Sequence, residues 1–388
     1  MRQAMHRFLL LTNIPAPYRI AFFNTLAGEM AAHAIGLRVV YCAETEPNRH
    51  WAINLVDQRY QWTILRGLHA SLGPRFIHVN PGVVSLIRKW SPHWLLIGGA
   101  WHLPTMWLAS RRVFAPNAAR ILWTEGHADA VLNRRGPIAA LRRRAFRSFD
   151  AFAVPNARSA EFACSEAGRP LPILPLANTV DEDFYHPPAG LDRRALRESL
   201  GIAPGLRVVV SVAQLTDRKG VVELARAYGT LPAHIRRGSL LAFLGDGDQR
   251  QTLTAAGRAA APGEIRLLGH VSGETVRSWL WAADIFCLAT RLDPNPLSPI
   301  EASFAGLPLL LSSNAGNVNE LVREGETGWR LESIEEGVIR ESLSIALSAD
   351  QDQIRRMGRA AHENADQSFR RSSVARRFVS ALLDLFPA

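Results

Sequence analysis

The 388-residue chain has few cysteines, almost no lysine and no long apolar run. Its three cysteines are widely spaced and odd in number, which excludes a disulfide framework and favours a reducing cytosol. No apolar stretch approaches the roughly 20 residues that a membrane-spanning helix requires. The apolar stretch near the basic N-terminus is too short for a signal sequence, so residues 8–12 are interpreted as a core strand.

Signatures of several other protein classes are also missing. The chain has neither zinc-finger spacing nor an aromatic RNA-binding motif, which weakens a nucleic-acid hypothesis. The segment GDGDQR ends in Arg250 where Gly-x-Gly-x-x-Gly requires a glycine, which argues against a dinucleotide-dependent oxidoreductase. Asp181-Glu182-Asp183 has the form Asp-x-Asp, but its position at the expected domain junction argues against a metal site there.

Length and composition indicate a globular protein of two domains. The chain is 47% apolar and 21% charged, as is ordinary for globular proteins, and it is too long for one typical core. Short apolar strand patterns alternate with helical patterns, which predicts parallel sheets covered by helices. The pattern is interrupted over residues 177–194, which are rich in proline and acidic residues.

The expected elements form two similar series. Strands are expected at residues 8–13, 37–42, 93–99, 119–124, 151–155, 207–213, 239–245, 264–269, 284–290 and 307–313. Helices are expected at residues 18–30, 159–168, 221–229, 273–283 and 298–306, and a long amphipathic one at 370–386.

We therefore predict an α/β fold of two doubly wound, Rossmann-like lobes that face each other across a cleft. The first lobe is expected at residues 1–183 and the second at 184–365, with the helix in 366–388 packing back on the first lobe. Because such lobes bind ligands at the carboxyl ends of their strands, the cleft is the expected site.

Positive charge is concentrated in the first half of the chain. Residues 1–180 hold 21 Lys+Arg and 9 Asp+Glu, a net charge of +12, whereas the remainder holds 24 and 26, a net charge of −2. A helix expected after Pro137 carries much of the excess, in Arg134, Arg135, Arg142, Arg143, Arg144 and Arg147. We hypothesise an anionic partner, with anionic lipid first; the alternative is a solvated helix face.

Residues 291–313, RLDPNPLSPIEASFAGLPLLLSS, place prolines and acids directly before a core strand. Pro294 and Pro296 predict an extended loop. Ser298 and Glu301 predict a capping box, so a helix is expected to begin abruptly at the carboxyl end of a strand, where its free N–H groups suit a phosphate.

Two carboxylates flank this expected helix start. Asp293 lies in the loop and Glu301 in the first helical turn, and we expect both to face one ligand. The alternative is that Glu301 only completes the capping box and that Asp293 is a solvated turn residue.

Lysine is rare in this chain, so the position of each lysine is informative. The chain has 43 arginines and only two lysines, Lys89 and Lys219. Arg218 and Lys219 follow the strand expected at 207–213, at another strand end of the same lobe. A compact ammonium group in a chain that otherwise uses arginine suggests a phosphate contact; the alternative is an ordinary surface lysine.

These segments together resemble the retaining GT-B glycosyltransferases of glycosyltransferase family 4. The resemblance is specific over residues 205–332, where RKG, FLGDGDQRQTL and DPNPLSPIEASFAGLPLLLSS keep the family's order and spacing. Less distinctive matches at TNIPAPYRIAFFNTL, IGGAWHLPTMW and LANTVDEDFY extend it over nearly the whole chain. It implies transfer of a sugar from a nucleoside diphosphate sugar to an acceptor hydroxyl, with retention and without a metal or other cofactor.

The resemblance also implies roles for residues of the second lobe. The family's Glu-x7-Glu motif falls on Asp293 and Glu301, which would contact the transferred sugar and the ribose. The family's Arg-x4-Lys pair falls on Gln214 and Lys219, and Arg218 is expected to replace the missing arginine at the diphosphate. The remaining implied donor contacts are the amides of Leu297 and Ser298 at the diphosphate, and Gly269, His270 and Val271 at the base.

The first lobe provides weaker candidates. His127 loosely matches the histidine with which the family reaches the donor sugar. On the acceptor side we expect the loop from Asn13 to Arg19, Gly98 and Gly99, and the neighbouring Trp101 and His102. The alternatives are a tight turn for the glycines, core packing for Trp101 and a structural role for His127.

We accordingly predict a retaining, hexosyltransferase-type enzyme of cell-envelope polysaccharide, glycolipid or glycoconjugate biosynthesis. Its expected partners are a sugar nucleotide, a glycan or lipid-linked acceptor and an anionic membrane surface, and no nucleic acid. It is expected in the cytoplasm or on the inner face of the cytoplasmic membrane. The alternatives are a non-catalytic sugar-nucleotide-binding subunit, which Gln214 and Asp293 favour, and a GT-B epimerase or phosphorylase.

Overall fold

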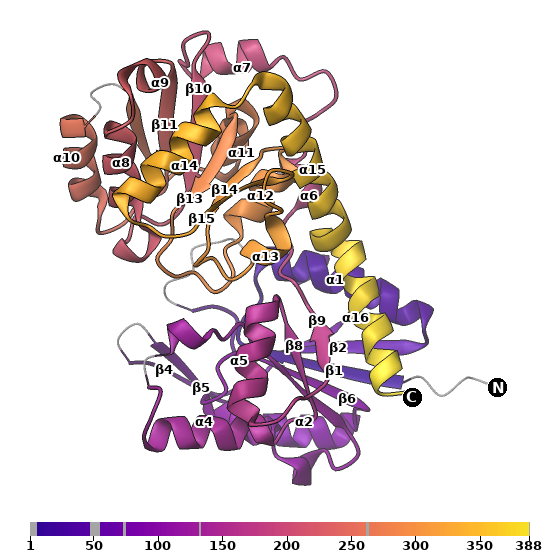
Figure 1. Ribbon diagram of the computed structural model, residues 1–388. Coiled ribbons are helices and arrows are strands. Elements are labelled where there is room, and N and C mark those ends of the chain that lie inside the picture. The colour runs from indigo at the N-terminus through magenta and orange to yellow at the C-terminus, as the bar shows by residue number, and fades with distance from the viewer. Residues whose placement is uncertain (1–5, 47–54, 73–74, 132, 261–263, 388) are drawn as a thin grey trace. The chain divides into compact units, whose positions relative to one another are not determined.

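The computed structural model describes residues 6–46, 55–72, 75–131, 133–260 and 264–387 (Figure 1). The chain forms two compact units: unit 1 is Met1–Thr179 with Arg371–Ala388, and unit 2 is Val180–Arg370. Each is built on a parallel sheet covered by helices, which confirms the predicted fold class.

Unit 1 contains a seven-stranded parallel sheet in the order β3-β2-β1-β6-β7-β8-β9. Its strands are β1 His6–Thr12, β2 Ile35–Tyr41, β3 Gln61–Ile64, β6 Trp94–Gly98, β7 Ala119–Trp123, β8 Ala151–Val154 and β9 Ile173–Pro175. An antiparallel hairpin is formed by β4 Leu68–Leu72 and β5 Arg75–Val79. The helices are α1 Pro17–Ala32, α2 Gly82–Trp90, α3 Pro104–Ala109, α4 Pro137–Arg147, α5 Ala157–Ala167 and α16 Arg371–Leu385.

Strand β1 shows why the sheet is buried on both faces. Phe8 and Leu10 pack into one core cluster, and Leu9 and Leu11 pack into another. Successive side chains of a strand point to opposite faces, so an unbroken apolar run requires a core on each side of the sheet.

The C-terminal helix α16 packs on α1 and belongs to unit 1. Its break from α15 (Gln351–Phe369) falls at Arg370, a few residues after the boundary expected from the sequence. The first boundary also differs from the expected one, because α6 (Glu182–Tyr185) packs on α12 (Ser298–Phe304) of unit 2.

Phe378 provides a test of how strongly α16 is integrated into unit 1. Its fully buried ring meets Phe8 edge to face at 5.9 Å between centroids. Phe378→Ala should lower the free energy of unfolding of unit 1 by about 3–5 kcal/mol, measured by hydrogen exchange of the β1 amides. The matched control is Leu385→Ala at an exposed position of the same helix; equal effects of the two variants would contradict the assignment.

Unit 2 contains a six-stranded parallel sheet in the order β12-β11-β10-β13-β14-β15. Its strands are β10 Arg207–Val212, β11 Ser239–Leu244, β12 Ile265–Gly269, β13 Ile285–Leu288, β14 Leu309–Ser312 and β15 Gly328–Leu331. With α6, α12 and α15, the helices are α7 Arg193–Ser199, α8 Val221–Gly229, α9 Ala233–Arg237, α10 Arg250–Ala260, α11 Gly273–Ala282, α13 Val318–Leu321 and α14 Glu336–Ser348. All ten strands expected from the sequence are present in the two sheets.

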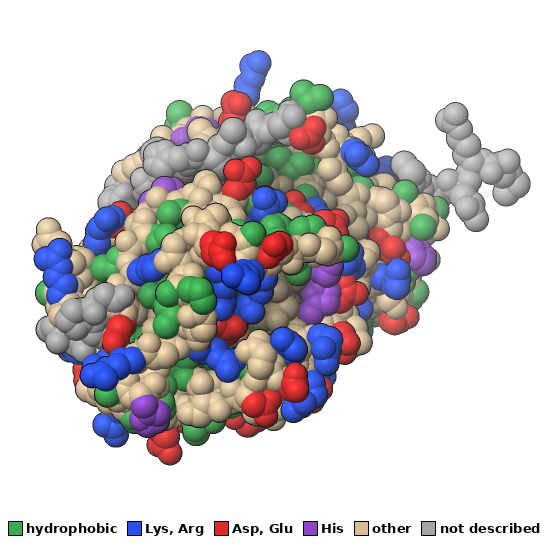
Figure 2. All heavy atoms as spheres, turned by 90° about the horizontal axis from the view of Figure 1, so that it is seen from above, with side chains coloured by type: hydrophobic (Ala, Val, Ile, Leu, Met, Phe, Trp, Pro, Cys, Tyr) green, Lys and Arg blue, Asp and Glu red, His purple; other side chains and the backbone are tan. Residues whose placement is uncertain are grey.

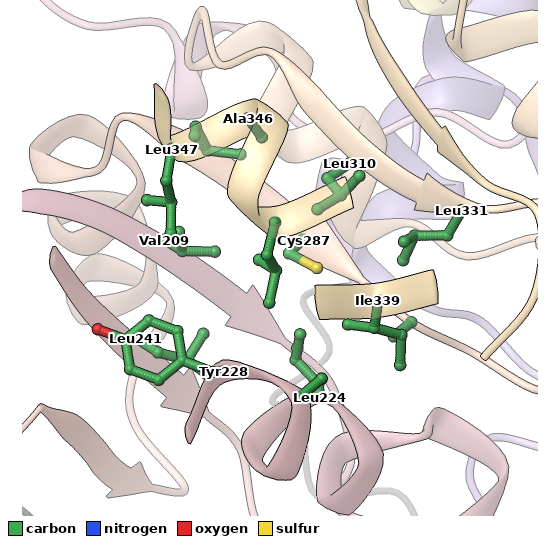
Figure 3. Packing of buried hydrophobic residues seen from close by; sticks show 14 of the residues in the cluster. Val209, Leu224, Tyr228, Leu241, Cys287, Leu310, Leu331, Ile339, Ala346 and Leu347 are labelled. Atoms are coloured by element: carbon green, nitrogen blue, oxygen red, sulfur yellow. The ribbon is translucent and has the colours of Figure 1, made fainter. Parts of the chain in front are cut away.

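The core of unit 2 lies between its central strands and the helices on one face of the sheet. Val209 of β10 and Cys287 of β13 pack there with Leu224 of α8 and Ile339 of α14 (Figure 3). Cys287 is buried and, like the other two cysteines, forms no disulfide. This packing fixes the two strands whose ends carry the candidate site.

Strand order in each sheet reverses between its two central strands, β1 and β6 in unit 1 and β10 and β13 in unit 2. Ligands of open α/β sheets bind at the carboxyl ends of the strands at such switch points. The loops after these four strands are therefore the places to search for a site.

The two units differ in charge. Unit 1 holds 24 Lys+Arg and 10 Asp+Glu, a net charge of +14, and unit 2 holds 21 and 25, a net charge of −4. On the face shown in Figure 2, basic and acidic side chains are interspersed. None of the helices in the described residues has the length and apolarity needed to span a membrane.

Candidate active site

Two loops meet at the switch point of unit 2, one after β10 and one after β13. Gly220 joins the first loop to α8 in a left-handed conformation, with φ of 60°. A Cβ atom there would lie 2.0 Å from the carbonyl oxygen of Ala289, so only glycine allows the loops to approach this closely. The carbonyl oxygen of Arg218 accepts hydrogen bonds from the Thr290 hydroxyl at 2.9 Å and the Arg291 amide at 2.8 Å.

This approach brings Lys219 and Asp293 together. The Lys219 ammonium group donates a hydrogen bond to Asp293 Oδ2, and the two side chains are only 12% and 11% exposed. Asp293 is held by its backbone, whose carbonyl oxygen accepts from Gly316 N at 2.7 Å. An amino group and a carboxylate are thus fixed side by side at the ligand-binding edge of the sheet.

The predicted capping box is wrong. Helix α12 begins at Ser298, so Leu297 is its N-cap residue and no side chain caps it. The Leu297 carbonyl oxygen accepts from the amides of Ile300 at 2.9 Å and Glu301 at 3.1 Å. Within the described residues, the amides of Leu297 and Ser298 donate to no protein acceptor, so they remain available as individual donors.

The Glu301 carboxylate accepts a hydrogen bond from the Tyr185 hydroxyl instead. Tyr185 ends α6, and its carbonyl oxygen accepts from Trp281 Nε1 at 2.7 Å. Burial raises the pKa of Glu301 to about 7. Tyr185 was not predicted, because it lies in the stretch 177–194, whose pattern predicted no element.

The raised pKa of Glu301 predicts a pH-dependent stability. The native carboxyl group keeps a proton that the unfolded chain releases from about pH 4.5 upward, so stability should fall as the pH rises to about 7. Glu301→Gln should remove roughly 2 kcal/mol of this fall between pH 5 and pH 8, measured by denaturant unfolding. The control is Glu341→Gln at an exposed position of α14; an unchanged pH dependence in Glu301→Gln would refute the assignment.

The other predicted donor residues lie along the same sheet edge. Gln214 and Arg218 have exposed side chains in the loop after β10, and Arg218 forms no ion pair with any described residue. Gly269 ends β12 with φ of 75°, followed by the exposed His270 and the partly exposed Val271. Strand β12 lies two strands from β10, about 10 Å away, a spacing that suits the two ends of a nucleotide.

Unit 1 contains a cavity of about 700 Å³ at the carboxyl ends of β1, β6 and β7. Four predicted residues line it: Asn13, Trp101, His102 and His127. Residues of α4 and α5, among them Leu141, Phe146 and Phe162, complete its wall and were not predicted. No sequence signal pointed to them, because the exposure of Leu141 and the burial of Phe146 are seen only in the structure.

Three predicted acceptor-side residues do not line this cavity. Gly98 and Gly99 are closely surrounded by other parts of the protein, so a larger residue would clash at either position. A Cβ atom on Gly98 would lie 2.9 Å from the Trp123 ring, and one on Gly99 would lie 2.6 Å from Asn13 Oδ1. Arg19 donates to the Thr12 hydroxyl at 3.1 Å and stacks over the Trp123 ring at 4.7 Å.

His127 is buried in the wall of the cavity, and its Nδ1 accepts a hydrogen bond from the Asp129 amide at 3.2 Å. Burial lowers the pKa of His127, which favours the neutral ring. Since Nδ1 accepts, the proton of the neutral ring lies on Nε2, where it can be donated to a hydroxyl ligand.

Asp181 and Asp183 of the Asp-x-Asp sequence have structural partners. Asp181 Oδ1 accepts from the Phe184 amide at 3.3 Å and caps α6, while Asp183 lies 3.7 Å from the Arg370 guanidinium. Among the described residues, no three His, Cys, Asp or Glu side chains are grouped so that they could hold a metal ion.

Comparison with solved structures establishes the class of fold. Anabaena HepE, solved in complex with UDP, superposes with a TM-score of 0.74 at 15% identity, covering 98% of this chain and 100% of that one. The chain thus has the GT-B fold.

Sequence comparison finds similarity to glycosyltransferases over most of unit 2. Residues 192–364, which hold every donor residue predicted in the second lobe, match the family model described as glycosyl transferases group 1. D-inositol 3-phosphate glycosyltransferase of Nocardia farcinica is 30% identical over 43% of this chain and 38% of its own length. N-acetyl-alpha-D-glucosaminyl L-malate synthase of Bacillus anthracis is 22% identical over 55% of this chain and 54% of its own. The chain thus spans about a third to a half of the length of the curated relatives it matches.

Proposed function

We propose that this protein is a glycosyltransferase that moves a sugar from a nucleoside diphosphate sugar to an acceptor hydroxyl with retention of configuration, in glycoconjugate biosynthesis. The observation that carries the proposal is the Lys219–Asp293 pair at the switch point of unit 2, within the segment that matches the group 1 family model. Uridine diphosphate sugars are the first donors to test, because HepE was solved with UDP.

In this proposal unit 2 holds the donor. As the glycosidic bond breaks, negative charge develops on the leaving diphosphate, and Lys219 with the amides of Leu297 and Ser298 would neutralise it. The exposed Arg218 adds a second cation, in place of the arginine that the resemblance implies at position 214. These groups perform the charge stabilisation that a metal ion would otherwise supply.

The carboxylates of Asp293 and Glu301 would bind different parts of the donor. Asp293, held in place by Gly316 N and Lys219, would accept hydrogen bonds from hydroxyls of the transferred sugar. Glu301 would accept from the ribose, and this requires that Glu301 lose its proton. Donor binding should therefore strengthen as the pH rises towards about 7.

Unit 1 would hold the acceptor, with the Nε2 proton of His127 available in the wall of its cavity. Its net charge of +14 supports docking to an anionic membrane surface on the cytoplasmic side. Sedimentation with anionic and neutral liposomes over a salt series tests the docking; binding that ignores both salt and lipid charge would exclude it.

The catalytic proposal is tested by incubating the protein with a panel of sugar nucleotides and acceptors, with and without a chelator. We expect turnover that survives chelation and a product with the anomeric configuration of the donor, determined by NMR. An inverted product would exclude retention, and a product without a new glycosidic bond would indicate an epimerase or phosphorylase.

A non-catalytic sugar-nucleotide-binding subunit is the second candidate. The exposed Gln214, at the position where the resemblance implies an arginine, favours it. Calorimetric binding of the nucleotide sugar, without hydrolysis or transfer to any acceptor, would support this candidate over the enzyme.

A further inference from the structure

Three titratable side chains of unit 1 form a hydrogen-bonded chain that has no part in the function proposed above. His78 of β5 is only 2% exposed, and both of its ring nitrogens have a partner. Its Nε2 lies 3.0 Å from Glu46 Oε1, and its Nδ1 lies 2.9 Å from His69 Nδ1. His69 is exposed on β4, so the chain leads from solvent through a buried ring to the Glu46 carboxylate.

Glu46 lies at the other end of this chain, in the wall of the unit 1 cavity. Its side chain is 11% exposed, and within the described residues its second carboxylate oxygen, Oε2, accepts no hydrogen bond. Glu125 also lines the cavity, but it accepts from Asn178 Nδ2 at 3.1 Å and lies 3.9 Å from the Arg19 guanidinium. Of these two carboxylates, Glu46 is therefore the one with an oxygen available to a ligand in the cavity.

The surroundings of Glu46 place no fixed positive charge beside it. Among the described residues, no arginine or lysine forms an ion pair with its carboxylate. Helix α3, which packs on β5, carries no charged residue, and desolvation and the neighbouring His78 lower the pKa of His69. Burial raises the pKa of the nearby Cys42 thiol to about 12, which keeps it neutral. The other titratable or charged groups in the cavity wall are His102, Glu125, His127 and Arg142, which is paired with Glu166.

Transfer of a sugar to a hydroxyl releases the proton of that hydroxyl, and no residue assigned above takes it up. Asp293 and Glu301 are assigned to the donor, and His127 presents a proton at Nε2 instead of a lone pair. A general base must lie within hydrogen-bond reach of the proton that it removes. A carboxylate oxygen in the wall of a cavity meets this condition for a ligand bound there.

We propose that Glu46 is the general base for an acceptor hydroxyl bound in the cavity of unit 1, and that His78 is its positioning residue. Glu46 Oε2 accepts the hydroxyl proton while the hydroxyl oxygen forms the new bond to the anomeric carbon of the sugar. The diphosphate leaves with the electron pair of the bond that breaks, and Glu46 then passes its proton to water. The inference rests on the proposed function and deepens it by naming the residue that activates the acceptor.

The two histidines make this base sensitive to pH. On the order of pH 6 the pair takes up a proton, and a positive charge beside Glu46 Oε1 weakens the carboxylate as a base. Turnover should therefore fall on the acid side, with a midpoint in the range of a histidine. In His78→Gln, an amide still donates to Glu46 but cannot titrate, so the midpoint should move down by about 1–2 pH units, towards that of a carboxyl group.

Glu46→Gln tests the base itself, because it keeps an oxygen for the His78 proton and removes the basic group. Its kcat should fall about 10²–10⁴-fold, with little change in the KM of the acceptor or in UDP affinity. The assay uses the best donor and acceptor of the panel, or hydrolysis of the donor with water as the acceptor. Formate should restore turnover to Glu46→Ala in a concentration-dependent way, because it supplies a small carboxylate; a structural role predicts no such rescue.

The matched control is Glu44→Gln, an exposed carboxylate of the same loop, which should turn over as the unaltered protein does. Thermal unfolding verifies the fold of each variant, and His69→Gln at an exposed position repeats the pH measurement if His78→Gln is unstable. A turnover of Glu46→Gln close to that of Glu44→Gln would overturn the inference and would indicate that the leaving diphosphate takes the proton. An acid-side midpoint that stays in place in both histidine variants would exclude the histidine pair as its cause.

The unaltered protein separates this inference from the proposed function. If it binds UDP and transfers sugar while Glu46→Gln is equally active, the general base alone is refuted. If the unaltered protein neither binds UDP nor consumes any sugar nucleotide, the proposed function is refuted, and the role of Glu46 with it.

Discussion

Replacing Lys219 with alanine should lower the turnover of glycosyl transfer by about 10²–10³-fold, as does removal of a single charge-stabilising donor in other enzymes. The ammonium group lies at the switch point of unit 2, paired with Asp293. Its loss should also weaken the binding of nucleoside diphosphates. The measurement is steady-state transfer with the best donor of the panel, together with calorimetry of UDP.

The substitution has a structural cost that must be separated from catalysis. Without Lys219, the Asp293 carboxylate is left largely buried and unpaired, which typically costs about 3–5 kcal/mol. Assays therefore belong at temperatures below the measured unfolding transition of the variant. The control is Lys89→Ala, the other lysine of the chain, exposed on α2. A folded Lys219→Ala protein with a turnover close to that of Lys89→Ala would contradict the assignment.

Asp293→Asn should reduce turnover by about 10²-fold or more, yet it should not weaken UDP binding. The carboxylate is proposed to accept hydroxyls of the transferred sugar, and it also competes with the diphosphate for the ammonium group of Lys219. Its neutralisation should therefore leave UDP affinity unchanged or raise it. Calorimetry of UDP and of the donor sugar nucleotide, combined with turnover, measures this separation.

The control for this second variant is Asp217→Asn, a well-exposed carboxylate in the loop before Lys219. It should change neither turnover nor UDP affinity by more than a few-fold, because exposed charges interact weakly. If Asp293→Asn weakens UDP as strongly as Lys219→Ala does, the two residues do not have the separate roles proposed here.

The strands that could be predicted from the sequence are those with runs of buried apolar residues. The run from Phe8 to Leu11 packs on both faces of its sheet, and similar runs produced all ten expected strands. The hairpin strands β4 and β5 were missed, and so were β3, β9 and β15. The last three have four, three and four residues. Their places at the sheet edges depend on neighbours rather than on their own composition.

The sequence was sufficient to predict that Lys219 and Asp293 lie at the same edge of the sheet. Both follow core strands, and parallel strands of one sheet end at the same edge. The partner of Glu301 was not accessible in this way. Ser298 and Glu301 have the spacing of a capping box, but a local pattern contains no information about Tyr185, more than a hundred residues earlier in the chain.

The glycines at the end of β6, Gly98 and Gly99, show a second limit of prediction from the sequence. Two adjacent glycines at a strand end suggest space for a ligand, yet Trp123 and Asn13 occupy that space. The cavity lies instead beside α4. The six arginines of residues 134–147 predicted an anionic partner, but nothing predicted that Ile138 and Leu141 line a cavity. Which side chains fill a space is decided by packing between distant segments.

The central claim is that Lys219 and the amides of Leu297 and Ser298 form a diphosphate site in unit 2, beside the carboxylate of Asp293 that receives the transferred sugar. It is tested most directly by titrating nucleoside diphosphates and the matching monophosphates into the protein and into Lys219→Ala. The claim predicts that the diphosphate binds more tightly than the monophosphate and that Lys219→Ala loses most of this difference. Equal affinities of diphosphate and monophosphate, or a difference that persists without Lys219, would contradict it.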